Sequence, residues 1–141
     1  MLNWFKKSSE SQKPKTLGQI GEEMAQEEYR KKGFKIIAKN EYNKTGKRLG
    51  EIDFIAKNKD TLVFVEVKTR ASDKGRFGSA IESVDYFKQV KILKAVKLYL
   101  LRNRNYLKFK PKIDVCVIIM NEFDKSPKSV KIYSNAVEDW N

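Results

Sequence analysis

The chain reads Gly50-Glu51-Ile52-Asp53-Phe54-Ile55-Ala56 and then, after a short polar break, Leu62-Val63-Phe64-Val65-Glu66-Val67-Lys68. Both segments have the composition of buried β-strands, yet they contain Asp53, Glu66 and Lys68. An ionised side chain that is buried without a partner is costly, so three of them in one hairpin are expected to act together. Two carboxylates and an ammonium suit the binding of a divalent cation and the activation of a water molecule.

The spacing of the hairpin predicts how these charges are arranged. If Lys59-Asp60 is a two-residue loop, Asp53 falls opposite Glu66. Side chains alternate along a strand, so Lys68 shares the face of Glu66. A three-residue loop would shift the pairing by one residue and misalign Asp53. The other face is expected to be core, and it carries Ile52, Phe54, Ala56, Val63, Val65 and Val67.

Length and composition narrow the class of protein. A chain of 141 residues with 40% hydrophobic and 34% charged residues predicts one globular domain with a sizeable core. No apolar run approaches a membrane span, and residues 1–7 lack the apolar centre of a signal peptide. Together with a single cysteine, Cys116, which we interpret as a small buried hydrophobe, these features predict a cytoplasmic protein without a membrane partner.

Charge and the absence of histidine narrow the chemistry. The sequence contains no histidine, which excludes Ser-His-Asp and Cys-His catalysis and the usual zinc sites. Thirty basic residues against 18 acidic ones give a formal charge of +12 and favour nucleic acid as the partner. A merely solubilising lysine-rich surface is the alternative interpretation.

The order of the elements is predicted to be αβββαββ, with one mixed sheet. The predicted elements are a helix that opens at Thr16 with Gln19 at the capping-box position, a strand over 34–40, the hairpin over 50–69, a helix over about 84–101, a strand over 113–120 and a last strand over 130–137. Residues 1–15 are expected to form a flexible basic tail, 16–137 a single domain and 138–141 a C-terminal tail.

Several of these residues together carry a family resemblance. The spacing of Asp53, Glu66 and Lys68 is the D-x(n)-(D/E)-x-K pattern of the restriction-endonuclease-like nucleases. Residues 16–137 more narrowly resemble the YraN-like bacterial family, which is similar to archaeal-type Holliday-junction resolvases. The motifs are Gly18-Gln19-Ile20-Gly21-Glu22, Gly50-Glu51-Ile52-Asp53, Phe64-Val65-Glu66-Val67-Lys68, Phe77-Gly78 and Asp114-Val115. The resemblance implies an α/β fold with a restriction-endonuclease-like αβββαβ core, in which helices flank a central mixed sheet.

The resemblance also implies roles for individual residues. In related nucleases the residues that correspond to Asp53, Glu66 and the Val67 carbonyl bind Mg²⁺ or Mn²⁺, and the one that corresponds to Lys68 positions or deprotonates the attacking water. A glutamate on the first helix often completes the site, and here it is Glu22; an ordinary exposed helix carboxylate is the alternative. Ile52 replaces the proline that often precedes the aspartate. Gln89 is followed by Leu93 rather than the tyrosine of the exonuclease-like branch, which disfavours that branch.

The resulting prediction is a metal-dependent nuclease that acts on DNA, including branched or structured DNA. The residues expected to contact phosphates are Lys44, Lys47, Arg48, Arg70, Lys74 and Arg76 in loops, with Lys88 and Lys91 on the second helix. The lysines of that helix could equally form a solvated face, and Phe77 could wedge against an unpaired base or simply pack. Resolution of a junction would require a homodimer. Two alternatives stay open: a nucleic-acid-binding protein without hydrolytic activity, and a purely structural ion network.

Overall fold

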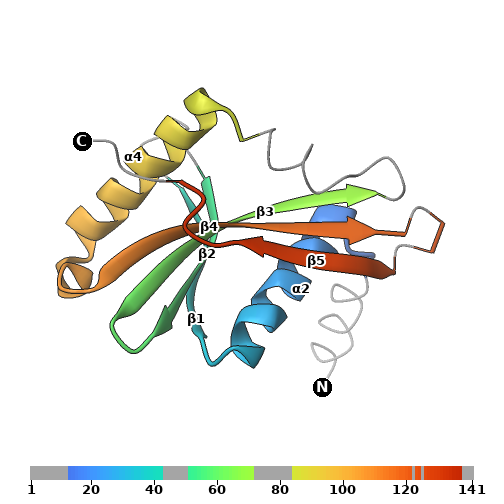
Figure 1. Cartoon of the computed structure of the whole chain (residues 1–141), viewed down its shortest axis with the longest axis horizontal. Coiled ribbons are helices and arrows are strands. Elements are labelled where there is room, and N and C mark those ends of the chain that lie inside the picture. The colour runs from blue at the N-terminus through green and yellow to red at the C-terminus, as the bar shows by residue number, and fades with distance from the viewer. Residues whose placement is uncertain (1–12, 43–50, 72–83, 122, 125, 138–141) are drawn as a thin grey trace, which may run out of the picture.

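The computed structural model describes residues 13–42, 51–71, 84–121, 123–124 and 126–137, which form a five-stranded sheet with two helices (Figure 1). The elements in chain order are α2 (Leu17–Lys31), β1 (Lys35–Tyr42), β2 (Glu51–Asn58), β3 (Thr61–Ala71), α4 (Tyr86–Arg102), the short 3₁₀ helix η1 (Arg104–Tyr106), β4 (Lys110–Met120) and β5 (Pro127–Tyr133). This order confirms the predicted αβββαββ arrangement and the α/β class. In the described part of the chain, neither helix has the length and apolarity needed to cross a membrane.

The sheet is mixed because only one pair of its strands is parallel. The strands lie in the order β1-β2-β3-β4-β5. Strands β3 and β4 are parallel, and α4 lies in the connection between them, whereas the other neighbours are antiparallel. Figure 1 shows β3, β4 and β5 running side by side away from the β2–β3 hairpin.

Helix α2 begins with the signal expected from the sequence. The Thr16 hydroxyl accepts a hydrogen bond from the Gln19 backbone N–H at 3.1 Å, and the Thr16 backbone N–H donates to the Gln19 side chain at 2.9 Å. This reciprocal pair is the predicted capping box. The chain turns into β1 through Gly33, whose φ of 90° is the left-handed conformation that glycine adopts without strain.

The hairpin loop has two residues, as predicted. Asn58 pairs with Thr61, and Lys59 turns the chain with a left-handed φ of 54°. From there the pairing continues to Phe54 opposite Val65. The register on which the alignment of Asp53 with Glu66 depends is therefore the one expected from the sequence.

Each face of the sheet carries its own apolar core. The core under α2 contains Ala25 and Tyr29 of the helix with Phe54, Ala56, Val63, Val65, Cys116, Ile118 and Met120 of the strands. The core under α4 contains Ile92, Ala95 and Val96 of the helix with Ile55, Leu62, Phe64, Ile113, Val115, Val117 and Ile119 of the strands. Cys116 is fully buried, as predicted, and burial raises the pKa of its thiol to about 12.

One core prediction is wrong in an informative way. Ile52 was expected on the face of Phe54 and Ala56, but it belongs to the core under α4. A regular strand would keep these three side chains on one face. The direction of the side chains along β2 therefore changes between Phe54 and Ile52, at Asp53.

Two strand boundaries also differ from the prediction. Strand β4 begins at Lys110, three residues before the predicted start, because the exposed residues there pair beside the first residues of β3 without an apolar pattern. Strand β5 spans Pro127–Tyr133 rather than 130–137. Val137 is buried against the α4 core after the strand has ended, so its apolar character does not indicate strand structure.

Candidate active site

Strand β2 separates from β3 at Asp53. The β2–β3 pairing ends at Phe54 and Val65, although β3 continues beside β4 to Ala71. Strand β2 itself continues to Glu51, paired only with β1. We call this point, defined by Asp53 on β2 and Val67 on β3, the fork; the two diverging strands can be followed in Figure 1.

The Asp53 side chain bridges the fork. Its Oδ2 accepts a hydrogen bond from the Val67 backbone N–H at 2.7 Å, so a carboxylate takes the place of a strand carbonyl. The N–H and C=O of one strand residue lie on the same side of the strand. The Val67 carbonyl therefore also points towards β2 at the fork, on the side where Asp53 lies.

Glu66 and Lys68 lie on the face of β3 that α4 covers. The Lys68 Nζ lies 3.5 Å from the Glu66 Oε1, and the two side chains are only 11% and 12% exposed. A second ammonium reaches the same oxygen from α4, because the Lys88 Nζ lies 3.3 Å from it. Asp85 fixes the first turn of this helix by accepting from the Lys88 backbone N–H at 2.9 Å. One nearly buried carboxylate thus faces two ammonium groups.

The two lysines have opposite pKa shifts. Burial, aided by the hydrogen bond with Lys88, lowers the pKa of Lys68 from 10.5 to about 8, against the opposing effect of Glu66. Burial alone would lower the pKa of Lys88 as well. Its hydrogen bond with Lys68 and the carboxylates of Glu66 and Asp53 outweigh burial, so the pKa of Lys88 is raised. Lys68 therefore loses its proton before Lys88 as the pH rises.

The first helix approaches β3 from the other face. A Cβ atom placed on Gly21 would lie 2.0 Å from the Thr69 Oγ1, so this contact requires glycine. The next residue, Glu22, is half-buried. Among the residues that the structure describes, Glu22, Asp53 and Glu66 do not form a three-carboxylate group that could hold a metal ion. The pair of Asp53 and Glu66 belongs to the hairpin, whereas Glu22 belongs to the helix on the opposite face.

The predicted phosphate-contacting residues fall into three groups. Arg70 is half-buried on β3 near Lys68, where its guanidinium donates to the Thr69 carbonyl at 3.0 Å and helps to lower the pKa of Lys68. Lys91 is exposed on α4. The others, Lys44, Lys47, Arg48, Lys74 and Arg76, together with Phe77, lie outside the described residues.

The sequence interpretation of Lys88 was incomplete. The sequence predicts Lys88 as a phosphate contact or as part of a solvated helix face, but its contact with Glu66 also makes it part of the site itself. The signal was present in the spacing, because Lys88 precedes the buried Ile92 by four residues. Residues four apart share a helix face, so this position faces the sheet rather than solvent.

Comparisons with other proteins place the site inside one family match. The family described as "Uncharacterised protein family UPF0102" matches residues 21–118, which include the fork and the first turn of α4. A UPF0102 protein of Caldanaerobacter subterraneus subsp. tengcongensis is 42% identical over 107 residues, which are 76% of this chain and 82% of that protein. A UPF0102 protein of Clostridium botulinum (strain Kyoto / Type A2) is 40% identical over 124 residues, which are 88% of this chain and 95% of that protein.

Proposed function

This chain belongs to the UPF0102 family, and we propose that it is a metal-dependent nuclease that hydrolyses phosphodiester bonds in DNA. The observation that carries the proposal is the hairpin site. Asp53 is held at the Val67 N–H, 2.7 Å away, and Glu66 lies on the neighbouring strand with Lys68 at 3.5 Å. The register of the hairpin brings Asp53 and Glu66 to the two positions that directly follow the last pair, Phe54 and Val65, where the strands begin to separate.

The donors at the fork suit a hard divalent cation. Asp53, Glu66 and the Val67 carbonyl would offer oxygen ligands, the type that Mg²⁺ and Mn²⁺ prefer. Two ammonium groups lie within 3.5 Å of the Glu66 Oε1, so the fold already places positive charge at this oxygen. Glu22 is a further candidate ligand, because it follows Gly21, at which α2 closely approaches Thr69 of β3.

Lys68 and Lys88 would have different roles in hydrolysis. Mg²⁺ or Mn²⁺, when bound, would polarise a phosphoryl oxygen and acidify the attacking water. Lys68, with a pKa lowered to about 8, is partly uncharged near neutral pH and can accept a proton from that water. Lys88 keeps its charge and offsets the negative charge that develops on the phosphate. Arg70 and Lys91 would hold neighbouring phosphates, which gives affinity that falls with salt.

The test is a cleavage panel of labelled linear, flapped and four-way DNA in Mg²⁺ and Mn²⁺. We expect Asp53→Ala and Glu66→Ala to reduce the cleavage rate at least about 10³-fold, while circular dichroism shows that both variants remain folded. Lys68→Ala should lose most of the rate as well. Asp60→Ala is the matched control, because it removes an exposed carboxylate from the loop of the same hairpin. Cleavage that survives EDTA, or that survives both substitutions, would contradict the proposal.

A second candidate is a nucleic-acid-binding protein that has this fold but does not hydrolyse its ligand. It is favoured by the finding that no three-carboxylate metal group is present among the described residues. In that case the wild-type protein would retard branched DNA in a gel but would cleave none of the substrates in either metal. Cleavage of a four-way junction by paired cuts would instead require two sites, and we would then expect a homodimer.

A further inference from the structure

The first turn of α4 exposes two large aromatic rings. Tyr86 is 65% exposed and Phe87 is 75% exposed. Their ring centroids lie 5.9 Å apart with an interplanar angle of 73°, so the rings form an edge-to-face pair. Neither side chain contributes to the cores of the sheet, which are formed by later residues of the same helix. We call Tyr86 and Phe87 the aromatic pair.

The aromatic pair adjoins the candidate active site through Lys88. Phe87 directly precedes Lys88, so their Cα atoms are about 3.8 Å apart. The Lys88 Nζ lies 3.3 Å from the Glu66 Oε1, and the Lys88 side chain is still 36% exposed. This side chain therefore extends from the surface beside Phe87 to the carboxylate of the site. The aromatic pair is therefore next to the residue whose side chain reaches from the surface to Glu66.

The charge around the aromatic pair indicates what kind of ligand covers it. The exposed residues Lys91, Lys94 and Lys97 continue along α4 from Lys88. The chain as a whole carries a formal charge of +12. An acidic polymer with flat apolar groups complements aromatic rings among ammonium groups, and single-stranded nucleic acid has this combination. In a paired duplex the base faces are already stacked on one another, so they cannot contact the rings.

We propose that the aromatic pair stacks on unpaired bases next to the bound phosphate, so that the preferred substrates are DNAs with unpaired bases: single strands, flaps and branch points. The position of these bases relative to a scissile phosphate rests on the proposed nuclease function. The preference in binding does not rest on it, because stacking and phosphate contacts operate without hydrolysis.

The test measures binding in EDTA by fluorescence anisotropy, with a labelled single strand of about 20 nucleotides and the fully paired duplex of the same sequence. We expect Phe87→Ala to weaken binding of the single strand about tenfold or more and to change binding of the duplex less than about twofold. A 2-aminopurine base at an unpaired position should be quenched on binding to the wild-type protein, and Phe87→Ala should abolish this quenching. Tyr86→Ala should show a smaller change in the same direction.

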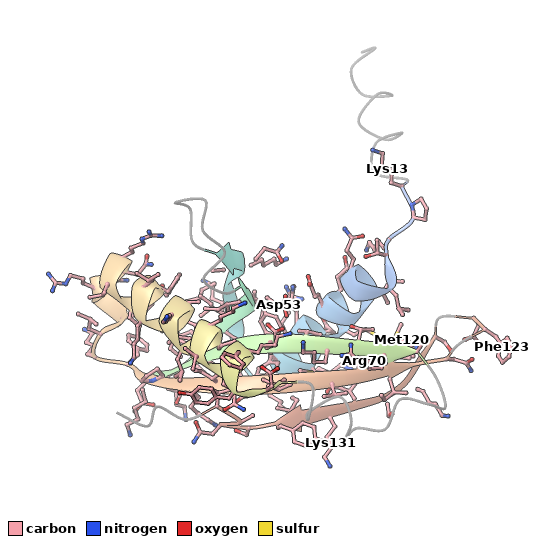
Figure 2. The ribbon with its side chains drawn as sticks, turned by 90° about the horizontal axis from the view of Figure 1, so that it is seen from above. Lys13, Asp53, Arg70, Met120, Phe123 and Lys131 are labelled. Carbon is pink, nitrogen blue, oxygen red and sulfur yellow. The ribbon has the colours of Figure 1, made fainter. Side chains whose placement is uncertain are left out.

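Phe123→Ala is the matched control. This phenylalanine is 92% exposed and lies on the turn between β4 and β5, beyond the end of the sheet and away from Asp53 (Figure 2). Its removal should leave binding of both DNAs unchanged.

The inference would be overturned if Phe87→Ala lost affinity equally for the single strand and the duplex, or lost affinity for neither. The inference would also be overturned if light scattering showed a dimeric wild-type protein and a monomeric Phe87→Ala variant, because the aromatic pair would then be a subunit interface. Selective binding of single strands without cleavage in any metal would overturn the nuclease proposal alone.

Discussion

Each face of the sheet holds a carboxylate with little exposure to solvent, but the two carboxylates have different partners. On the α2 face, Asp114 is 3% exposed and accepts hydrogen bonds from the Tyr29 hydroxyl at 2.6 Å and the Asn135 backbone N–H at 2.8 Å. On the α4 face, Glu66 faces the ammonium groups of Lys68 and Lys88. The strands that carry Asp114 and Glu66 are parallel neighbours, so the two carboxylates lie close in the sheet but point to opposite sides.

The different partners indicate a structural role for Asp114 and a reactive role for Glu66. Asp114 has one neutral donor for each oxygen, and these donors connect helix α2 and the segment after β5 to strand β4. Glu66 instead lies against two ammonium groups, and the pKa of one of them, Lys68, is lowered by burial and by its hydrogen bond with the other, Lys88. Folding gains little from such an arrangement, because burying charge offsets most of the attraction. The cluster of Glu66, Lys68 and Lys88 therefore suits a reactive site, because it lies next to the fork.

The largest effect on stability is expected from Asp114→Ala. The substitution leaves the Tyr29 hydroxyl and the Asn135 N–H without their buried acceptor, and it removes the link between α2 and β4. We expect the free energy of unfolding to fall by about 3 kcal/mol, measured by urea denaturation. DNA binding per folded molecule should stay unchanged.

Asp60→Ala serves as the control for loss of a carboxylate, because Asp60 is exposed and its ion pair with Lys110 contributes little. Tyr29→Phe removes only the hydroxyl donor and should lower stability by about 1 kcal/mol. If Asp114→Ala instead left stability intact and abolished metal-dependent cleavage, Asp114 would belong to the chemistry and the contrast between the faces would fail.

A smaller loss is expected from Gly21→Ala, which tests how closely the α2 face is packed. The new Cβ would lie 2.0 Å from the Thr69 Oγ1 and 3.0 Å from two carbon atoms of the same side chain, so the helix or the strand must shift. We expect a loss of about 2 kcal/mol in thermal or urea unfolding. Combining the change with Thr69→Ala should recover about 1 kcal/mol, because the nearest atom is then absent.

Gly18→Ala is the matched control on the same helix. Its added Cβ would meet only the Thr16 Oγ1 at 3.9 Å, an ordinary contact. Alanine also favours the helix over glycine, so this variant should be neutral or more stable by up to about 1 kcal/mol. Equal losses for Gly18→Ala and Gly21→Ala would mean that the contact with Thr69 does not limit the approach of α2.

The sequence was sufficient to predict the hairpin and its register. The two-residue loop and the alternation of side chains determine which residues share a face, and these are local properties. The capping box of α2 is local as well. The family motifs then identified Asp53, Glu66 and Lys68 as a group, and the structure describes all three at the fork or on the strand beside it.

The fork itself and the role of Lys88 could not be predicted in this way. The alternation of apolar residues along β2 does not change where β2 separates from β3. Ile52 was therefore predicted on the face of Phe54, although it lies in the core under α4. Lys88 is 22 residues from Glu66 in sequence, and its contact depends on how α4 packs over the sheet. Periodicity places Lys88 on the stripe of Ile92, but only the packing of the helix shows which strand residue it meets.

The smallest expected effect is a gain in stability, from Lys68→Met. The folded state holds the pKa of Lys68 near 8 rather than 10.5, so between these pH values it binds fewer protons than the unfolded chain. Stability therefore rises with pH across this window, and the cost of charging Lys68 is fully present below pH 8. Lys68→Met removes that cost, so we expect the variant to be about 1 kcal/mol more stable at pH 7.

This advantage should shrink as the pH rises from 8 to 10.5, because the wild-type lysine is then uncharged in the folded protein. Lys91→Met, which removes an exposed lysine of α4, should change stability by less than about 0.5 kcal/mol at either pH. A Lys68→Met variant that is less stable than wild type at pH 7 would show that Lys68 mainly neutralises Glu66. The cluster on the α4 face would then be structural, as the hydrogen bonds around Asp114 are, and the division between the two faces would disappear.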